Sequence, residues 1–329
     1  MPIHHEVEFQ SNGVTCRGDL TVPDGPGPHP IVVMAGGWCY VKEIVMPHYA
    51  SYIQDAGMAT LIFDYGCLGA SDGEPRQHLD PWAQIEDYKN AISFVESQPE
   101  LDENRIAVWG ISYSGGHVLI LGAIEPRIKC IVSNIPVVDG YANQRRVQGE
   151  ERFIKMKELL LADRRARYKD EANRGTIPFS SEDWNTLSVW PFADVFKVFK
   201  NIKETEAPRH EHWSTIESEE LLLNYTVFPY TKRILNIPTM MVVAEGDEKT
   251  LWDLEIEAFN TITANNKKLE VLPSVSHMSL YSSRSHLQIA GTSAADWLAK
   301  HLAVAGDAAP ATEPSMQDEV KFIEEASRG

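Results

Sequence analysis

Short apolar runs recur along the chain and predict the strands of a buried sheet. They are nearly continuous and rich in β-branched residues, which is typical of parallel strands covered on both faces. The runs are PIVVMA (30–35), ATLIFDY (59–65), RIAVWG (105–110), IKCIVSN (128–134), TMMVVA (239–244) and KLEVLP (268–273). Ahead of them, EVEFQ and VTCRGDLTVP predict an antiparallel hairpin.

Between these runs lie segments whose apolar residues recur at helical spacing. They are MPHYASYIQDAG, PWAQIEDYKNAISFVESQ, GGHVLILGAIE and DLEIEAFNTITANN. Alternation of strands and helices is typical of an α/β fold. We therefore predict a mostly parallel, doubly wound sheet.

The alternation stops after Asp139, and the next core strand begins only at Thr239. Connections in compact domains are usually about 2 to 6 residues long, so this segment predicts an inserted domain. We assign residues 1–138 and 236–302 to the core and residues 139–235 to a helical cap. Residues 303–329 begin as an Ala/Pro/Gly linker, and two alternatives stay open for this tail: disorder, or docking on a neighbouring subunit.

Charge and hydropathy limit the partners of this chain of 329 residues. Its 47 acidic and 30 basic residues give a formal charge of −17, which repels a phosphate backbone and argues against nucleic acid. No run of 18 apolar residues occurs, and MPIHHEVEFQ lacks the features of a signal peptide, so we expect a cytoplasmic protein that does not bind membranes. The sequence leaves a homodimer open.

The cysteines predict neither disulfides nor a metal site. Cys16, Cys39, Cys67 and Cys130 form no C-x-x-C pair and no metal-ligand spacing, so we expect free thiols. No metal or nucleotide motif is present, and we predict a protein without metal or cofactor.

The segment WGISYSGGHV (109–118) has the features of a nucleophile elbow, a sharp strand-to-helix turn that exposes a serine. Both Ser112 and Ser114 have small residues two positions away. The predicted strand ends at Gly110, and the nucleophile follows that glycine by two positions, which favours Ser112. Ser114 then occupies the position of the usual second glycine.

A serine nucleophile needs a base and a carboxylate, which in this fold follow it in the order Asp/Glu, then His. AEGDEKT follows the next-to-last predicted strand, and PSVSHMSLY follows the last. The carboxyl ends of parallel strands meet at one edge of a sheet, so we predict His277 as the base and Asp247 as its carboxylate. Glu245 stays open as an alternative to Asp247.

Two backbone amides are expected to bind the oxyanion that forms on attack. One belongs to Tyr113, directly after the nucleophile, and the other to Trp38 in the glycine-containing loop MAGGWCYVKE. The phenol of Tyr40 is an alternative donor.

Aromatic residues of the predicted cap are candidates for substrate binding. We predict Trp184, Trp190 and Phe192, together with Tyr40, as pocket residues. The alternative is that the aromatic residues of this segment, Phe196 and Phe199 included, form the cap's own core.

These motifs resemble the α/β-hydrolase superfamily. GISYSGG, DYGCLGASDGEPR (64–76) and the order of AEGD and SH are similar to its dienelactone-hydrolase-like and X-Pro-peptidase-like branches. Within them, the layout of residues 213–250 is similar to YcjY-like hydrolases and to fungal polyketide transferases and thiohydrolases. The sequence departs from the common pattern at Gly36, where histidine is usual, at Ser114, and at Ser276, where glycine is frequent. No cysteine lies in the elbow, unlike in dienelactone hydrolases proper.

The combined motifs predict a serine hydrolase that cleaves a carboxylic ester of a small or medium-sized molecule through an acyl-enzyme. The resemblance adds a thioesterase or acyltransferase with the same residues as an alternative. A peptidase or amidase is a further alternative. Of a different class is a non-catalytic binding protein with a hydrolase fold.

Overall fold

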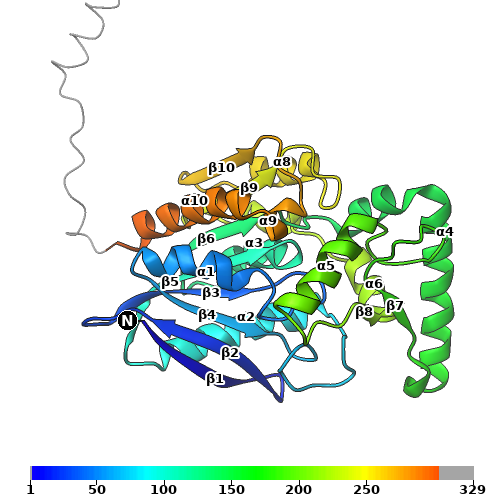
Figure 1. Cartoon of the computed structure of the whole chain (residues 1–329), viewed down its shortest axis with the longest axis horizontal. Coiled ribbons are helices and arrows are strands. Elements are labelled where there is room, and N and C mark those ends of the chain that lie inside the picture. The colour runs from blue at the N-terminus through cyan, green and yellow to red at the C-terminus, as the bar shows by residue number, and fades with distance from the viewer. Residues whose placement is uncertain (1, 304–329) are drawn as a thin grey trace, which may run out of the picture.

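A sheet of eight strands forms the centre of the protein in a computed structural model that describes residues 2–303 (Figure 1). The strand order is β1-β2-β4-β3-β5-β6-β9-β10. β1 pairs with β2, and β2 with β4, in antiparallel fashion, and the other neighbours are parallel. The strands are β1 (Ile3–Ser11), β2 (Val14–Val22), β3 (His29–Ala35), β4 (Ala59–Asp64), β5 (Leu101–Ile111), β6 (Ile128–Asn134), β9 (Thr239–Ala244) and β10 (Lys267–Leu272). This confirms the predicted mostly parallel sheet.

Helices cover both faces of the sheet. α1 (Met46–Asp55) and α10 (Arg284–Leu302) pack against each other on one face. The other face carries α2 (Pro81–Glu96), α3 (Tyr113–Ile124) and α8 (Trp252–Thr261). Because both faces are covered, every residue of β4 and β9 is buried, whereas most of the edge strand β10 is only half-buried.

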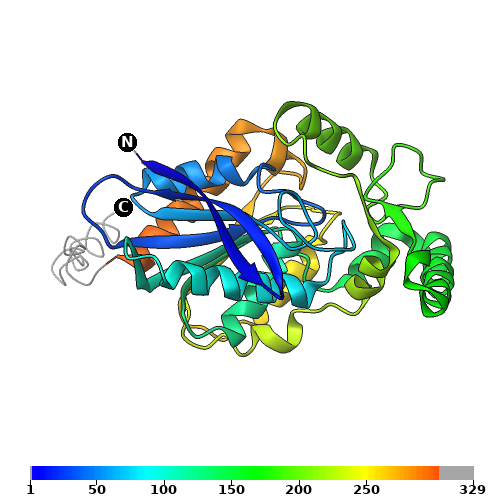
Figure 2. The same cartoon turned by 90° about the horizontal axis from the view of Figure 1, so that it is seen from below.

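The segment between β6 and β9 extends beyond one end of the sheet, as both views show (Figures 1 and 2). We call residues 139–235 the cap segment; their status as a separate domain stays a prediction. Its elements are α4 (Gly140–Lys169), η1 (Glu171–Asn173), β7 (Thr176–Pro178), α5 (Ala193–Thr205), β8 (Trp213–Thr215), α6 (Ile216–Leu223) and α7 (Phe228–Thr231). β7 and β8 pair as a separate antiparallel ribbon.

The long helix α4 forms the outer edge of the cap segment (Figure 2). Its course is broken at Gly149, whose φ of 68° and ψ of 171° are not helical. The part after this break is rich in charged residues, Arg164, Arg165 and Arg167 among them. A buried ion-pair group fixes its far end, because Arg167 binds Asp163 at 2.7 Å and Glu217 at 2.8 Å.

Three sequence expectations concern the cysteines, membrane-spanning helices and the tail. All four cysteines are free thiols. Among residues 2–303, no helix is long and apolar enough to cross a membrane. The expected tail, apart from Ala303, lies outside the described residues.

Candidate active site

Loops at the carboxyl ends of β3, β5, β9 and β10 meet beside the cap segment. Ser112 and His277 from these loops line one small cavity together with Trp38 and Tyr40. The cap segment closes this cavity with four apolar side chains, Phe179, Trp190, Val195 and Phe199. The carboxyl ends of parallel strands thus bring together groups that lie far apart in the sequence.

Ser112 sits on a strained turn between β5 and α3. Its φ of 58° and ψ of −116° are sparsely populated for a residue with a side chain, and such conformations cost about 1–3 kcal/mol. The strand and the helix approach so closely that a Cβ on Gly110 would lie 2.3 Å from the carbonyl oxygen of Ser114. Small residues are required at this turn for that reason.

The neighbouring Ser114 is fully buried, and its hydroxyl is used by the fold. The hydroxyl oxygen accepts a hydrogen bond from the Ile111 amide at 2.8 Å, and the hydroxyl donates to the Ala35 carbonyl at 2.7 Å. It therefore ties the elbow to the end of β3. Of the two serines, Ser112 is the one that lines the cavity.

His277 is held by Asp247 through a hydrogen bond of 2.7 Å between Nδ1 and Oδ2. The carboxylate can only accept, so Nδ1 carries the proton and Nε2 is left as a possible base. Asp247 also accepts from the Lys249 amide at 2.7 Å, and from the amide and hydroxyl of Thr250 at 3.2 and 3.0 Å. These bonds fix the carboxylate within the turn after β9.

The environment keeps Asp247 ionised. Burial alone would raise the pKa of this carboxyl, but the charge and the hydrogen bond of His277 and the two amide donors outweigh it, so that the pKa lies below its ordinary value. The alternative carboxylate, Glu245, is exposed to solvent, and the bond to His277 comes from Asp247.

The loop after β3 lies against Ser112, as expected for an oxyanion loop. A Cβ on Gly37 would be 3.0 Å from the Cβ of Ser112, a tighter contact than nearly all Cβ atoms make, so glycine favours this approach. The amide of Trp38 donates no hydrogen bond within residues 2–303. Tyr113 is the first residue of α3, and amides of a first helical turn have no partner inside the helix. Both predicted amides are therefore free to bind a ligand.

A chain of hydrogen bonds from the cap segment supports this loop at Cys39, whose φ is 57°. Nδ1 of His210 lies 3.1 Å from the Cys39 carbonyl, and Nε2 lies 3.0 Å from Nδ1 of His212. Nε2 of His212 in turn lies 2.6 Å from the Ser180 hydroxyl.

The direction of this chain is fixed by its two ends. A carbonyl only accepts, so His210 donates from Nδ1, His212 donates to His210, and Ser180 donates to His212. Burial lowers the pKa of His210 to about 3 and that of His212 to about 4, so both rings are neutral near pH 7. The Cys39 thiol adds a second link, since it donates to the Trp213 carbonyl at 3.3 Å.

The predicted substrate-binding residues separate into two groups. Tyr40 and Trp190 line the cavity. Trp184, in contrast, is 57% exposed, the Arg152 guanidinium lies 4.5 Å from its ring centre, and it is not among the residues that line this cavity. Phe192 is half-buried and packs against the ammonium of Lys249 at 4.5 Å, outside the cavity lining.

Several residues of the site were not predicted from the sequence. Phe179 lies on the loop after β7, and Lys249, Thr250 and Met278 directly follow or surround the predicted acid and base. Lys249 binds Asp194 of α5 at 3.0 Å and so joins the acid-bearing turn to the cap segment. The position of Thr250 three residues after Asp247, where a hydroxyl can bind the carboxylate, is a signal that could have identified it.

The cavity is small and largely apolar. Its volume is about 20 Å³, and aromatic rings make up much of its wall. Within residues 2–303, no three His, Cys, Asp or Glu side chains lie close enough to hold a metal ion. A serine on a strained turn, a histidine bound to a carboxylate and two free amides are the groups that acyl transfer requires.

Comparisons with known proteins find relatives of this chain. The sequence profile of the X-Pro dipeptidyl-peptidase (S15 family) matches residues 12–279. The thiohydrolase aneE of Aspergillus aculeatus is 28% identical over 292 residues, which cover 86% of each chain. The quorum-quenching protein AidA of Acinetobacter baumannii is 38% identical over 138 residues, but the chain spans only 45% of that protein.

A solved structure confirms the α/β-hydrolase fold. The crystal structure of the α/β hydrolase GrgF from Penicillium sp. superposes with a TM-score of 0.78 at 24% identity, over 92% of this chain and the whole of that one. At this level of identity the likeness concerns the fold.

Proposed function

Because the chain belongs to the X-Pro dipeptidyl-peptidase family (S15), a family of hydrolases, we propose that it is a serine hydrolase acting on carboxylic esters of small or medium-sized molecules. One observation carries the proposal. Ser112, on a turn with a positive φ, lines the same cavity as His277, which Asp247 binds at 2.7 Å. A buried histidine–carboxylate pair beside a serine in the same cavity is the arrangement of a nucleophile and its base.

In the proposed reaction, Ser112 Oγ attacks the ester carbonyl while Nε2 of His277 takes its proton. Asp247 keeps His277 in the tautomer that leaves Nε2 bare and stabilises the cation that forms. The amides of Trp38 and Tyr113 bind the oxyanion, and removal of one such donor typically costs about 3 to 4 kcal/mol. His277 then protonates the leaving oxygen, and water resolves the acyl-enzyme in a second, equivalent cycle.

Tyr40 is placed to assist as a third donor. Its hydroxyl lies close enough to Ser112 and Tyr281 for each to affect its ionisation. Burial raises the pKa of this phenol well above its ordinary value, so it keeps its proton and can donate to an oxyanion.

A thioesterase or acyltransferase is the second candidate. The similarity to the thiohydrolase aneE, which extends over most of both chains, favours a thioester as the acyl donor. The same groups would act, and an acceptor alcohol or thiol would replace water in the transferase. A peptidase or amidase, the activity in the family's name, ranks third.

Labelling with a fluorophosphonate tests the nucleophile. We expect the intact mass of the wild-type protein and of Ser114→Ala to increase by one adduct, and that of Ser112→Ala to stay unchanged. A label that persists in Ser112→Ala and disappears in Ser114→Ala would refute the assignment.

Substrate panels test the reaction class. Acyl p-nitrophenyl esters, acyl thioesters and anilides with a common acyl group would be compared by kcat/KM, with and without an acceptor alcohol. We expect the esters to rank first and water to resolve the acyl-enzyme. Inactivity on all three series would favour a binding protein.

A further inference from the structure

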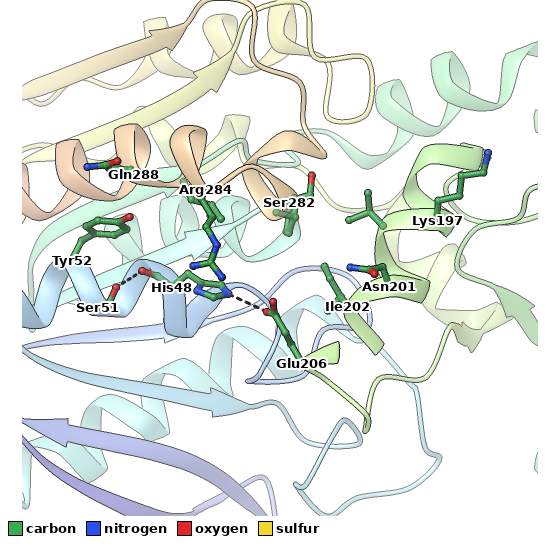
Figure 3. Close-up of a pocket in the computed structure, with 13 residues that line it drawn as sticks. His48, Ser51, Tyr52, Lys197, Asn201, Ile202, Glu206, Ser282, Arg284 and Gln288 are labelled. Carbon is green, nitrogen blue, oxygen red and sulfur yellow. Dashed lines mark hydrogen bonds and ion pairs between the residues drawn. The ribbon is translucent and has the colours of Figure 1, made fainter. Parts of the chain in front are cut away.

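A second, larger cavity lies between the cap segment and the core, close to the catalytic groups. Its volume is about 660 Å³, and it is bounded by α5 on one side and by α1, α9 (Ser279–Ser282) and α10 on the other. Figure 3 shows the side chains that converge on it, with Arg284 of α10 reaching toward His48 of α1. Nothing in the proposed reaction so far uses this space.

The two cavities differ greatly in size. The space beside Ser112 has a volume of about 20 Å³, little more than the roughly 10–15 Å³ that a single bound water molecule needs. A bound ester therefore cannot be contained there unless side chains move. The larger cavity falls within the range of about 300–1,000 Å³ that is usual for small-molecule sites.

Tyr281 separates the two spaces. Its ring stacks on His277 with 5.6 Å between centroids and packs edge-on against Tyr40 at 5.7 Å. The same residue lines the larger cavity. Its hydroxyl is buried and lies near the hydroxyls of Tyr40 and Ser112.

The position of His277 decides which part of a substrate would use the larger cavity. His277 protonates the leaving group, so the leaving group must lie on the side of its imidazole ring. Tyr281 stacks on this imidazole ring and lines the larger cavity, and Trp190 and Phe179 of the cap segment supply an apolar wall near Ser112.

The charges around the larger cavity favour an anion. Arg284 and Lys197 line it, and the acid that lines it, Glu206, is bound to His48 at 3.0 Å. Within residues 2–303, Arg284 has no acidic partner, and the nearest acid to Lys197 is Glu182 at 3.9 Å. The cavity therefore carries more cationic than free acidic side chains, although the chain as a whole has a formal charge of −17.

Neutral donors complete the lining. The side-chain amides of Asn201 and Gln288 form no hydrogen bond within the described residues, and both residues line the cavity. An unpaired guanidinium with two free amides suits a carboxylate or a phosphate, because charged oxygens accept several such bonds.

We propose that this cavity binds the anionic leaving group of the substrate, with Arg284 as its principal cation and Tyr281 as the movable wall between it and Ser112. The proposal rests on the proposed esterase function and specifies its substrate class. The proposed substrates carry a carboxylate or a phosphate on the alcohol part of the ester, or on the thiol part of a thioester.

The test compares esters that share butanoate as the acyl group. Their phenols carry a para carboxylate, a para phosphate or a neutral para carboxamide, and the first two distinguish the possible anions. We expect Arg284→Gln to lower the ratio of kcat/KM for an anionic ester to that for the neutral ester about fivefold, the effect of one exposed ion pair. The ratio is compared between the variant and the wild-type protein, so the different intrinsic reactivities of the leaving groups cancel.

Arg165→Gln is the matched control. Arg165 is an exposed arginine of α4, without an acidic partner in residues 2–303, at the outer edge of the cap segment. This variant removes the same charge and should leave the ratio unchanged. An unchanged ratio in Arg284→Gln, or an equal decrease in both variants, would overturn the proposal.

Tyr281→Ala tests the movable wall. We expect it to increase kcat/KM for a bulky naphthyl butanoate relative to methyl butanoate, whatever happens to the absolute rates. An unchanged or decreased ratio would contradict the role of Tyr281 as a movable wall between the cavity and Ser112.

A binding measurement separates this proposal from the proposed function. If the wild-type protein cleaves none of the esters, the esterase function fails, and calorimetry with 4-hydroxybenzoate and 4-hydroxybenzamide then decides the anion site. We expect Arg284→Gln to weaken binding of the carboxylate about fivefold and binding of the amide not at all. Equal binding by wild-type protein and variant would refute the site.

Discussion

The buried histidine chain behind the oxyanion loop predicts that the protein loses stability in mild acid. His210 is fully buried, donates to Cys39 and accepts from His212, so both of its ring nitrogens are occupied while it is neutral. A second proton on Nε2 would face the N–H of His212. Lowering the pH from 8 to 5 therefore charges this histidine in the unfolded chain while it stays neutral in the folded protein.

The size of the effect follows from the two pKa values of His210. Burial, first of all, and then the neighbouring His212 lower the pKa from 6.5 to about 3 in the folded protein. Between these values the unfolded chain binds more protons, so stability falls as the pH decreases through 6.5 and continues to fall until about pH 3. At pH 5 the difference, RT ln(1 + 10^1.5), is about 2 kcal/mol relative to pH 8.

Urea unfolding of wild-type protein and His210→Gln at pH 8 and pH 5 measures this difference. The glutamine can donate to Cys39 but does not titrate, so the wild-type free energy of unfolding should decrease by about 2 kcal/mol more than that of the variant. His4→Gln, at an exposed histidine, should behave like the wild type. The same pH dependence in His210→Gln and wild type would refute the reasoning.

Three further predictions concern the elbow and the acid. Asp247→Asn should lower kcat about 10³- to 10⁴-fold, because the proton of His277 is then no longer held on Nδ1 and Nε2 is no longer the free base. Glu245→Gln should change kcat less than about twofold. Steady-state kinetics with an activated ester measures both. Ser114→Ala should lower the free energy of unfolding by about 1–3 kcal/mol, measured with urea, because its two buried backbone partners lose their bonds; an unchanged stability contradicts this. Gly110→Ala should abolish fluorophosphonate labelling in intact-mass spectra, because its Cβ would overlap the Ser114 carbonyl, and labelling at the wild-type rate would show that the turn tolerates a side chain.

The sheet could be predicted from the sequence because buried parallel strands consist of apolar runs. β6 and β9 have the predicted limits, and β3 and β4 differ from them by one residue at one end. β5 begins at Leu101, before the predicted start at 105. The polar residues in its first half interrupt the apolar run, so no signal in the sequence marks this part of the strand. The buried, apolar parts of the strands could therefore be predicted from the sequence, whereas their polar ends could not.

The catalytic candidates could be located because chain order and strand ends determine their positions. Ser112 followed from the end of β5, and Asp247 from its place beyond β9, where the structure binds it to His277. The cap residues could not be assigned in this way. Trp184 and Trp190 have similar surroundings in the sequence, and only the tertiary course of their loop leaves one exposed and the other in the cavity wall.

The chain order of the site has a consequence for synthesis of the protein. Ser112 emerges from the ribosome well before β9, and Asp247 and His277 follow only after the whole cap segment. Until β10 and α10 appear, β9 presents an unpaired edge although all six of its residues are buried in the finished sheet. The nascent chain therefore has the proposed nucleophile without its proposed base and a sheet that cannot close, so the proposed activity and the final folding step both depend on the described residues from Asp247 onward.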